Sequence, residues 1–410
     1  GETPESVMRS QPRASLNRRL SRIRRWGCLT LAAAALLGGV NPIHAAAPSE
    51  TADPQTTAGL TLTARAGFDG YYKDGLWVPV RVSIANDGPD TQGALSIASP
   101  RSDGTQVLFT RAVQLPTQSR REFFFYIAPE GYVTSIKVTL RDGKTQLASA
   151  SVRIALLGAA DLLYGTLAGS PSSFGFLSDV DPVSGSAMVA QLTLDDLPPV
   201  GQAWQALDAL MVSDVDTGAL SPEQRAALAG WVANGGRLIV AGGPTWQKTA
   251  AGLSDILPLT PSGTQSLTNL SDLGAYSLAA PPQGIAVAAV GALAPDAATF
   301  SKLGSVPFVV SRRSGFGQIT YLTLDPAFAP LKGWDGLADV FRSIISLPSE
   351  RPGWAGGFRT NWSSANDAIN AVPGLDLPSA FQMCGFLLVY LLVVGPLNYM
   401  ILKRLHRREM

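Results

Sequence analysis

Cysteine and histidine are nearly absent from this sequence. Its 410 residues contain two of each, and these are Cys28, Cys384, His44 and His406. The stretch from residue 48 to residue 383 therefore has neither residue type, which excludes disulfides, Cys/His zinc sites and thiol chemistry there. A domain built from this stretch depends on burial of its apolar core for stability.

Charged residues are also scarce, at 15% of the chain, and the formal net charge is +1. Residues 1–47 hold seven Arg and two Glu, and residues 381–410 hold four Lys or Arg and one Glu. The remainder, residues 48–380, has 21 basic and 28 acidic residues, a net charge of about −7. A nucleic-acid-binding protein carries its basic excess on the folded domain. Here the excess borders apolar segments instead, so we exclude nucleic acid as a partner.

The first 47 residues have the order of a secretory signal. Seven arginines precede the apolar run 29–40, and a small-residue cleavage site follows at residues 45–47. The apolar run is shorter than the ~20 residues that a membrane-spanning helix needs. We expect residues 1–47 to be a pre-sequence and a cleaved signal peptide, with general and twin-arginine export both left open. Residues 48–57 are expected to be a disordered polar tether.

A second apolar run, residues 381–402, is long enough to cross a bilayer. Basic residues follow in the segment 403–410, and positive charge favours the cytoplasmic side. We therefore expect a single-pass protein of the cell membrane, with its ectodomain outside the cytoplasm and its C-terminus inside. Gly395-Pro396 is expected to kink the helix, because proline removes a backbone donor. The predicted anchor residues are Phe381, Gly395, Pro396, Asn398, Lys403, Arg404, Arg407 and Arg408.

The residues before this run, 349–380, contain several prolines and glycines. We expect a juxtamembrane connector. Trp354 and Trp362 either lie at the lipid headgroups, where amphipathic aromatic residues are favoured, or pack on the preceding domain. Whether the chain is truncated after residue 410 stays open.

Residues 58–156 alternate between apolar and polar positions, as in WVPVRVSIAN and VTSIKVTL. Turn signals such as Asn86-Asp87-Gly88 and Arg141-Asp142-Gly143 separate these runs. Their spacing predicts an immunoglobulin-like β-sandwich of about seven strands. Trp77 and the aromatic run 123–126 could form a ligand platform, but aromatic residues in alternating strands are usually core.

Strands alternate with helices from residue 160 to residue 348. Residues 208–212 contain the continuous apolar run ALMV, which is typical of a buried parallel strand. Ser221-Pro222-Glu223-Gln224 then supplies an N-cap, a proline at the first helical position and a capping-box partner. Gly235-Gly236 ends this helix, and residues 237–241 form the next buried strand. The pattern predicts an open, mostly parallel α/β sheet with right-handed crossovers.

The segment from the start of this helix to the turn after the next strand has a distinctive pattern. It reads Leu-Ser-x-x-Gln, then a helix, then Gly-Gly-Arg-Leu-Ile-Val-x-Gly-Gly. It resembles the class I glutamine amidotransferase-like domain, here between a β-sandwich and a C-terminal helix with a GPLNY segment. Active members of that class carry a cysteine on the turn after this strand, with a histidine and an acid completing the triad. Gly242-Gly243-Pro244 stands at that turn in this sequence. The resemblance therefore implies the fold without the activity, and we predict no catalytic residue.

Ligands of open α/β sheets bind beyond the carboxyl ends of the strands. That rule gives a candidate cleft formed by Asp214, Asp216, Gly242, Gly243 and Thr245. The paired acids could bind Mg²⁺ or Ca²⁺ through hard oxygen contacts, although capping of a loop is the simpler role for them. We predict no metal site and no cofactor.

Two functions follow as hypotheses from these patterns. The first is a non-catalytic, membrane-anchored, extracytoplasmic interaction or scaffold protein of the bacterial envelope, whose partner is another envelope or membrane protein. The alternative is a metal-dependent hydrolase that uses Asp214 and Asp216. The ligand, the pathway and the oligomeric state are not determined by the sequence.

Overall fold

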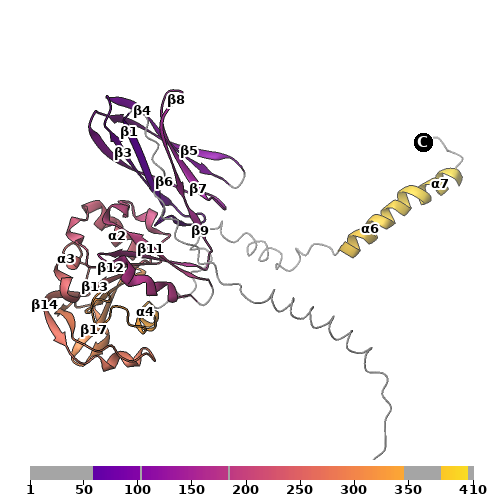
Figure 1. Ribbon diagram of the computed structural model, residues 1–410. Coiled ribbons are helices and arrows are strands. Elements are labelled where there is room, and N and C mark those ends of the chain that lie inside the picture. Colours follow the sequence, from indigo (N-terminus) through magenta and orange to yellow (C-terminus); the bar gives the residue numbers. More distant parts are fainter. Residues whose placement is uncertain (1–58, 102–103, 183–184, 346–379, 405–410) are drawn as a thin grey trace, which may run out of the picture. The chain divides into compact units, whose positions relative to one another are not determined.

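The computed structural model describes residues 59–101, 104–182, 185–345 and 380–404. This part of the chain is β-rich, with mixed sheets and one apolar C-terminal helix (Figure 1). The predicted signal peptide, tether and connector with Trp354 and Trp362, and the tail residues Arg407 and Arg408, lie outside the described residues. Those expectations stay predictions.

The first folded part contains two antiparallel sheets, with strand orders β1-β3-β6 and β5-β4-β7-β8. Buried and less buried positions alternate along β1, and the inward side chains of both sheets form one apolar cluster. The predicted period of two is therefore confirmed in these strands, while the immunoglobulin-like assignment stays a prediction. The strands are β1 (Leu60–Ala66), β3 (Val78–Asn86), β4 (Thr91–Pro100), β5 (Gln106–Leu115), β6 (Ser119–Ile127), β7 (Ser135–Asp142) and β8 (Thr145–Arg153).

The aromatic residues of this part divide between core and surface. Tyr72 and Phe125 are buried in the shared cluster, as expected for alternating strands. Trp77 is 42% exposed, so the expectation that it belongs to the core is wrong. It immediately precedes β3 and lies outside the alternation that buries the strand residues.

The second folded part is organised around a mixed seven-stranded sheet of order β11-β10-β12-β13-β18-β17-β16. The first five strands of that order run parallel, and β17 and β16 run antiparallel to their neighbours. The strands are β10 (Leu162–Ala168), β11 (Ala187–Leu192), β12 (Ala209–Ser213), β13 (Arg237–Ala241), β16 (Ala298–Leu303), β17 (Val306–Ser314) and β18 (Gly317–Leu322). Two small two-stranded sheets complete the described fold: β2 (Tyr71–Lys73) of the first folded part pairs with β9 (Ala155–Leu157), and β14 (Leu259–Leu267) pairs with β15 (Ala286–Leu293) in the second.

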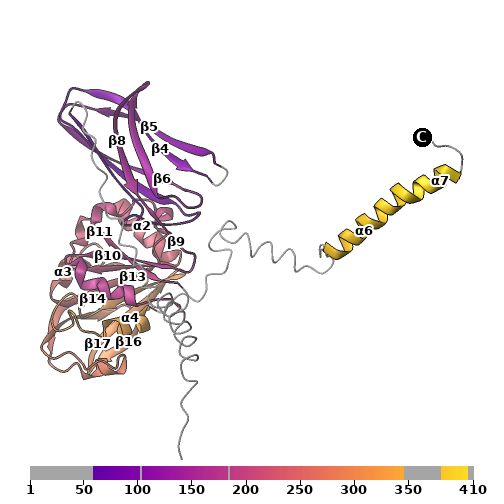
Figure 2. The ribbon, with the colours of Figure 1, turned by 45° about the vertical axis from the view of Figure 1, so that its right-hand side comes forward.

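Helices cover both faces of the large sheet (Figure 2). Along β13, Leu238 and Val240 join the cluster that contains α2, and Ile239 and Ala241 join the cluster that contains α4. Successive strand residues point to opposite faces, which explains the continuous apolar run of this strand. The helices are α2 (Pro222–Ala233), α3 (Trp246–Ala250), α4 (Leu337–Ile344) and the 3-10 turns η1 (Pro171–Asp179), η2 (Leu194–Asp196), η3 (Gly201–Trp204), η4 (Thr217–Ala219), η5 (Gly243–Thr245) and η6 (Ser271–Ala275).

The predicted start of α2 is confirmed in detail. The Gln224 backbone N–H donates to the Ser221 hydroxyl at 3.1 Å, and the Ser221 backbone N–H donates to the Gln224 side chain at 3.0 Å. Pro222 lies in the first turn of α2. A backbone N–H at this position would have no acceptor within the helix, so proline costs no hydrogen bond there. These contacts fix the direction in which the chain returns from β12 to β13.

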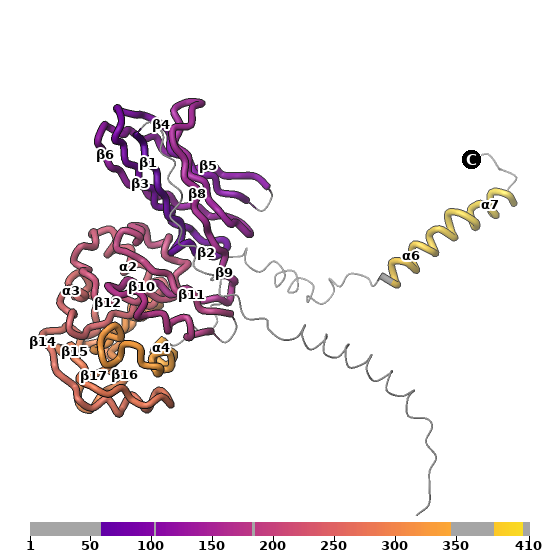
Figure 3. The backbone as a smooth tube through the Cα atoms, viewed as in Figure 1, coloured from indigo at the N-terminus to yellow at the C-terminus, as the bar shows by residue number. Residues whose placement is uncertain are grey.

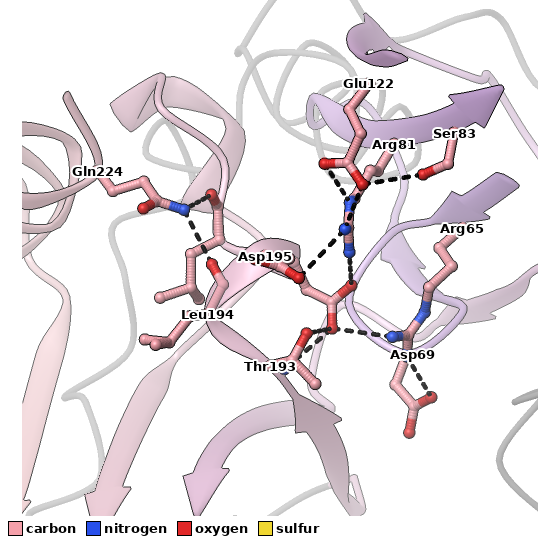
Figure 4. A network of polar contacts seen from close by, with 11 residues as sticks. Arg65, Asp69, Arg81, Ser83, Glu122, Thr193, Leu194, Asp195 and Gln224 are labelled. Carbon is pink, nitrogen blue, oxygen red and sulfur yellow. Dashed lines mark hydrogen bonds and ion pairs between the residues drawn. The ribbon is translucent and has the colours of Figure 1, made fainter. Parts of the chain in front are cut away.

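A network of charged side chains joins the two folded parts (Figure 4). Arg81 of β3 lies 2.7 Å from Glu122 and 3.3 Å from Asp195 of η2. Asp196 lies 3.5 Å from Arg81 and 3.0 Å from Arg65 of β1. Sequence patterns did not predict this network, because its members are far apart in the chain.

The C-terminal helix consists of α6 (Ala380–Leu392), the π-helical η8 (Val393–Leu397) and α7 (Asn398–Arg404). Figure 3 traces them in yellow as one continuous helix. The span Phe381–Arg404 has 24 residues and a mean hydropathy of 2.0, which are the length and composition of a membrane-crossing helix. None of its apolar window is buried against the rest of the described chain. Pro396 lies inside the π-helical turn, at the place where the sequence predicts a kink. Lys403 and Arg404 are exposed at its end.

Candidate functional site

The strand order of the large sheet reverses at β10. From β10 the chain continues to β11 on one side, and it then crosses to β12 on the other side. In open sheets the crevice beyond the carboxyl ends of such a strand pair is the usual place for a ligand. Gly169 follows β10 and Asp214 follows β12, so these two residues mark the reversal.

Asp214 has an unusual backbone conformation at this point. Its φ is 55°, in the left-handed region that residues with a side chain rarely adopt. A Cβ atom added to Gly169 would lie 2.6 Å from Asp214 Oδ2, so only glycine leaves room for this carboxylate. Lys248 Nζ lies 2.7 Å from Asp214 Oδ1, an ion pair that lacks the angles of a hydrogen bond. Backbone strain of this kind is concentrated at functional sites.

Asp216, the second predicted acid, is engaged elsewhere. It is exposed, and its Oδ1 accepts a hydrogen bond from the Gly218 backbone N–H at 2.9 Å, which caps η4. The structure therefore gives Asp214 and Asp216 different partners. Within the described residues, no group of three or more His, Cys, Asp or Glu side chains is arranged to hold a metal ion.

Asp325 is a member of this site that sequence analysis missed. It lies three residues beyond β18 and is 2% exposed. The Ser213 hydroxyl lies 3.0 and 2.8 Å from its two carboxylate oxygens, and the Ala327 backbone N–H donates to it at 2.8 Å. Burial raises the pKa of Asp325 to about 6, and the nearby negative charge of Asp214 adds to the increase. The available signal was an acid at the end of an apolar run, but the sequence does not place that run beside β13.

The turn after β13 is tightly packed at both predicted glycines. A Cβ atom on Gly242 would lie 2.5 Å from the Tyr321 hydroxyl oxygen. Gly243 has a φ of 63°, and its Cβ atom would lie 2.7 Å from Asp325 Cβ. Glycine is required here both for the backbone conformation and for the space. The turn thus brings Gly242 and Gly243 together with Asp325 and Tyr321 at the carboxyl edge of the sheet.

Two hydroxyl groups at this edge are buried without a hydrogen-bond partner in the described part of the chain, those of Thr245 and Tyr321. Tyr321 is fully buried, and burial raises the pKa of its hydroxyl well above the ordinary value. The geometry thus combines one buried carboxyl group, one surface ion pair and two unpartnered hydroxyls.

Replacement of Tyr321 with phenylalanine is expected to leave the free energy of unfolding unchanged or to raise it by about 1 kcal/mol. The change removes a buried hydroxyl that makes no hydrogen bond and keeps the ring in the core. Chemical denaturation of both proteins measures the difference. A loss of stability beyond 1 kcal/mol, as expected on the same principle for a hydroxyl with a native partner, would contradict this geometry.

The variant Asp325→Asn is expected to change how stability depends on pH. The folded-state pKa of Asp325 is raised from 3.8 to about 6, so the folded protein holds a proton that the unfolded chain releases. The contribution of Asp325 to the free energy of unfolding of the wild type therefore falls as pH rises from about 4 to about 6, and it is constant above about pH 6. Melting temperatures should show the variant gaining on wild type across that window. A constant difference from pH 4 to pH 7 would refute the assignment.

This chain is similar to one family of unknown function and has low similarity to solved structures. A family model described as a domain of unknown function (DUF8726) matches residues 59–155, and no curated protein matches the chain. The cytoplasmic protein STM3548 from Salmonella typhimurium has a TM-score of 0.33 and 13% identity over 52% of this chain and 95% of its own. The CARDB domain of the PF1109 protein from Pyrococcus furiosus, solved in complex with di-metal ions, has a TM-score of 0.21 and 13% identity over 25% of this chain and 97% of its own. Neither the family model nor these two structures is described as an amidotransferase. What the comparisons show is a match of residues 59–155 to a domain of unknown function.

Proposed function

We propose that this chain is a non-catalytic interaction protein. In this proposal the C-terminal helix anchors it in a cell membrane, and the two folded parts bind another envelope protein outside the cytoplasm. The observation that carries the proposal is the turn at Gly243. Any side chain there would meet Asp325, so the turn has no room for a nucleophile.

The rest of the edge supports the same conclusion. Nucleophilic catalysis by an amidotransferase-like sheet requires a thiolate beside an imidazole base. The sequence has neither residue type from residue 48 to residue 383. The Ser213 hydroxyl is fully buried and hydrogen-bonded to Asp325, which makes it a structural group instead of an exposed nucleophile. Asp214 and Asp216, the residues of the hydrolase alternative, have Lys248 and Gly218 as partners, and no observation favours that alternative.

The charged network between the folded parts supports a binding role. Asp196 is 8% exposed on its side chain, and it connects Arg65 and Arg81 of the first part to η2 of the second. Phe68 and Tyr71 add apolar contacts, because they belong to the same core cluster as the face of the large sheet that α2 covers. Such a pre-organised pair of domains loses little conformational entropy when a partner binds.

The test is site-specific photo-crosslinking of the full chain in the membranes of its source cells. A photoreactive residue at Lys248, which is 45% exposed on its side chain, reports on the carboxyl edge of the large sheet, where Asp214 lies. The control position is Leu108, 64% exposed in β5. We expect one discrete protein adduct from position 248 that is not formed from position 108.

Two results would overturn the proposal. One is turnover of an amide or ester substrate by the purified chain that is lost on replacement of Asp325 or Asp214. The other is protection of the folded parts from a protease added outside the membrane, combined with digestion after lysis. Identical adducts from both positions would show that the carboxyl edge of the large sheet is not the binding face.

A further inference from the structure

The strand β5 lies at the end of its sheet, and one of its edges pairs with no other strand in the described part of the chain (Figure 2). Its pairing with β4 runs over ten residues without a bulge. A long, regular edge strand presents a row of free N–H and C=O groups, which most proteins interrupt with a bulge, a proline or charged side chains. β5 has no proline, and Arg111 is its one charged residue.

Two other edge strands of the described chain are protected in these ways. Beside β11, the Asp181 carboxylate accepts from the Ala187 backbone N–H at 2.9 Å. The Asp69 carboxylate accepts from the Gln191 backbone N–H at 3.2 Å on the same strand. The edge strand β16 has two register shifts against β17 and carries Lys302. β5 therefore differs from both in leaving a regular edge open.

The ladder with β4 determines which backbone groups of β5 are free. The Arg101 N–H donates to the Thr105 carbonyl at 2.9 Å, which makes them a hydrogen-bonded pair that continues the register of the two strands. Bonded and non-bonded pairs alternate in an antiparallel ladder, so the next pair, Pro100 with Gln106, is non-bonded. The Pro100 carbonyl agrees with this, because it accepts from the Glu130 N–H at 3.1 Å. The residues of β5 whose N–H and C=O groups then face the free edge are Gln106, Leu108, Thr110, Ala112 and Gln114.

The sequence of β5 is nearly palindromic about Thr110, so two copies of the strand can pair with each other. An antiparallel pair centred on Thr110 overlaps over residues 106–114 and joins the residues whose backbone groups are free. It would form about ten backbone hydrogen bonds. None of the facing pairs has like charges, and the Leu108 side chain, 64% exposed, gains an apolar neighbour. The facing residues in this register are Thr110 with Thr110, Leu108 with Ala112, Gln106 with Gln114, Val107 with Val113, and Phe109 with Arg111.

Two neighbouring registers fit less well. A pair centred on Arg111 would place two arginines directly opposite each other, and like charges at such positions destabilise a sheet. A pair centred on Phe109 would leave Gln114 outside the overlap. Arg111 Cζ lies 5.1 Å from the centroid of the Phe123 ring of its own chain, so its charge is directed towards the other sheet and not across the free edge.

We propose that β5 pairs antiparallel with β5 of a second copy of this chain, so that two four-stranded sheets join into one across a two-fold axis. The inference concerns a strand of the first folded part, and it does not depend on the proposed anchoring or envelope partner. A photoreactive residue at position 108 should then give an adduct of twice the mass of the chain. That product differs from the adduct with an envelope protein that we expect from position 248.

The test is the oligomeric state of the purified full chain in detergent, measured by analytical ultracentrifugation. Thr110→Asp and Thr110→Lys each place two like charges opposite each other at the axis, so each variant alone should dimerise at least tenfold more weakly than wild type. An equimolar mixture of the two should recover dimers, because opposite charges then face each other. Thr145→Lys, at an exposed position in β8, is the control and should leave dimerisation unchanged.

Disulfide formation tests the register. In a background with Cys28 and Cys384 replaced by serine, Thr110→Cys should give a linked dimer on oxidation, because the Cα atoms of a hydrogen-bonded antiparallel pair are about 5.5 Å apart. Arg111→Cys should not, since its two copies are two residues out of register and more than about 7 Å apart. Efficient linkage at position 111 and none at position 110 would overturn the proposed pairing.

Two further results would contradict the inference. One is a wild-type chain that stays monomeric at about 100 µM, a concentration at which even a weak specific contact is populated. The other is a dimer that persists in both Thr110 variants, because the contact would then lie elsewhere, for example in the C-terminal helix. Recovery of dimers in the mixture also shows that both variants are folded, and circular dichroism checks each variant alone.

Discussion

The variant Gly243→Cys is expected to lose roughly 3 kcal/mol of folding stability and to gain no amidase activity. About 1 kcal/mol follows from a φ of 63°, which residues with a side chain adopt at a cost. A further 1–3 kcal/mol, roughly, follows from overpacking, since the new Cβ atom would lie 2.7 Å from Asp325 Cβ and 3.2 Å from the Asp325 backbone nitrogen. Neither neighbour is the end of a flexible side chain, so relief requires a backbone shift.

Gly333→Ala is the matched control for this prediction. Gly333 has a φ of 74° and no atom within 4 Å of an added Cβ, so it carries the conformational cost without the overlap. Urea denaturation should give a loss of about 1 kcal/mol for the control. Equal losses in both variants would mean that the turn tolerates a side chain. That result, or hydrolysis of an amide by the cysteine variant, would remove the main support for a non-catalytic function.

The second large effect is expected from Asp196→Ala, which should destabilise the protein by about 3 kcal/mol. Removing Asp196 takes a carboxylate partner from both Arg65 and Arg81 and removes the acceptor of the Thr193 donors, and a buried polar group that loses its partner costs about 1–3 kcal/mol. The Arg81 side chain is only 15% exposed, and the Asp196 carboxylate also accepts hydrogen bonds from the Thr193 N–H and hydroxyl at 2.9 and 2.7 Å. The loss should appear as earlier unfolding in urea.

Asp195→Ala is the control, because Asp195 contacts the same Arg81 at 3.3 Å but is 72% exposed on its side chain. An exposed ion pair of this kind contributes about 0–1 kcal/mol. Limited proteolysis adds a structural readout, since cleavage between the folded parts should accelerate in the Asp196 variant and not in the control. If the two variants lost the same small amount, the network would not hold the folded parts together.

Local features were predicted well from local signals. The capping box at Ser221 and Gln224 needs only the four residues of the helix start, and it is present in the structure. The alternation in β1 and β3 is confirmed because a period of two is written in consecutive residues. Trp77 shows the limit of this approach, since its neighbours suggest a core position that the structure does not give it.

The candidate site was predicted only in part. Gly242 and Gly243 were placed correctly at a strand end, since a glycine pair after a buried strand indicates a tight turn. Tyr321 of β18 and Asp325, three residues beyond that strand, were missed because β18 pairs with β13 although the paired residues are 81 positions apart in the chain. No local signal reports such a pairing.

The sequence by itself determined that residues 48–383 contain no cysteine or histidine, that one C-terminal segment has the length and composition of a membrane-crossing helix, and where most strands alternate. These are properties of composition and of neighbouring residues, and folding does not change them. Only the tertiary structure decided that Asp214 pairs with Lys248, that Asp325 is buried beneath the Gly243 turn and that Arg65 and Arg81 share Asp196. The physical reason is that a pKa, an ion pair or a steric overlap depends on distance and burial, which sheet order creates from residues far apart in the chain.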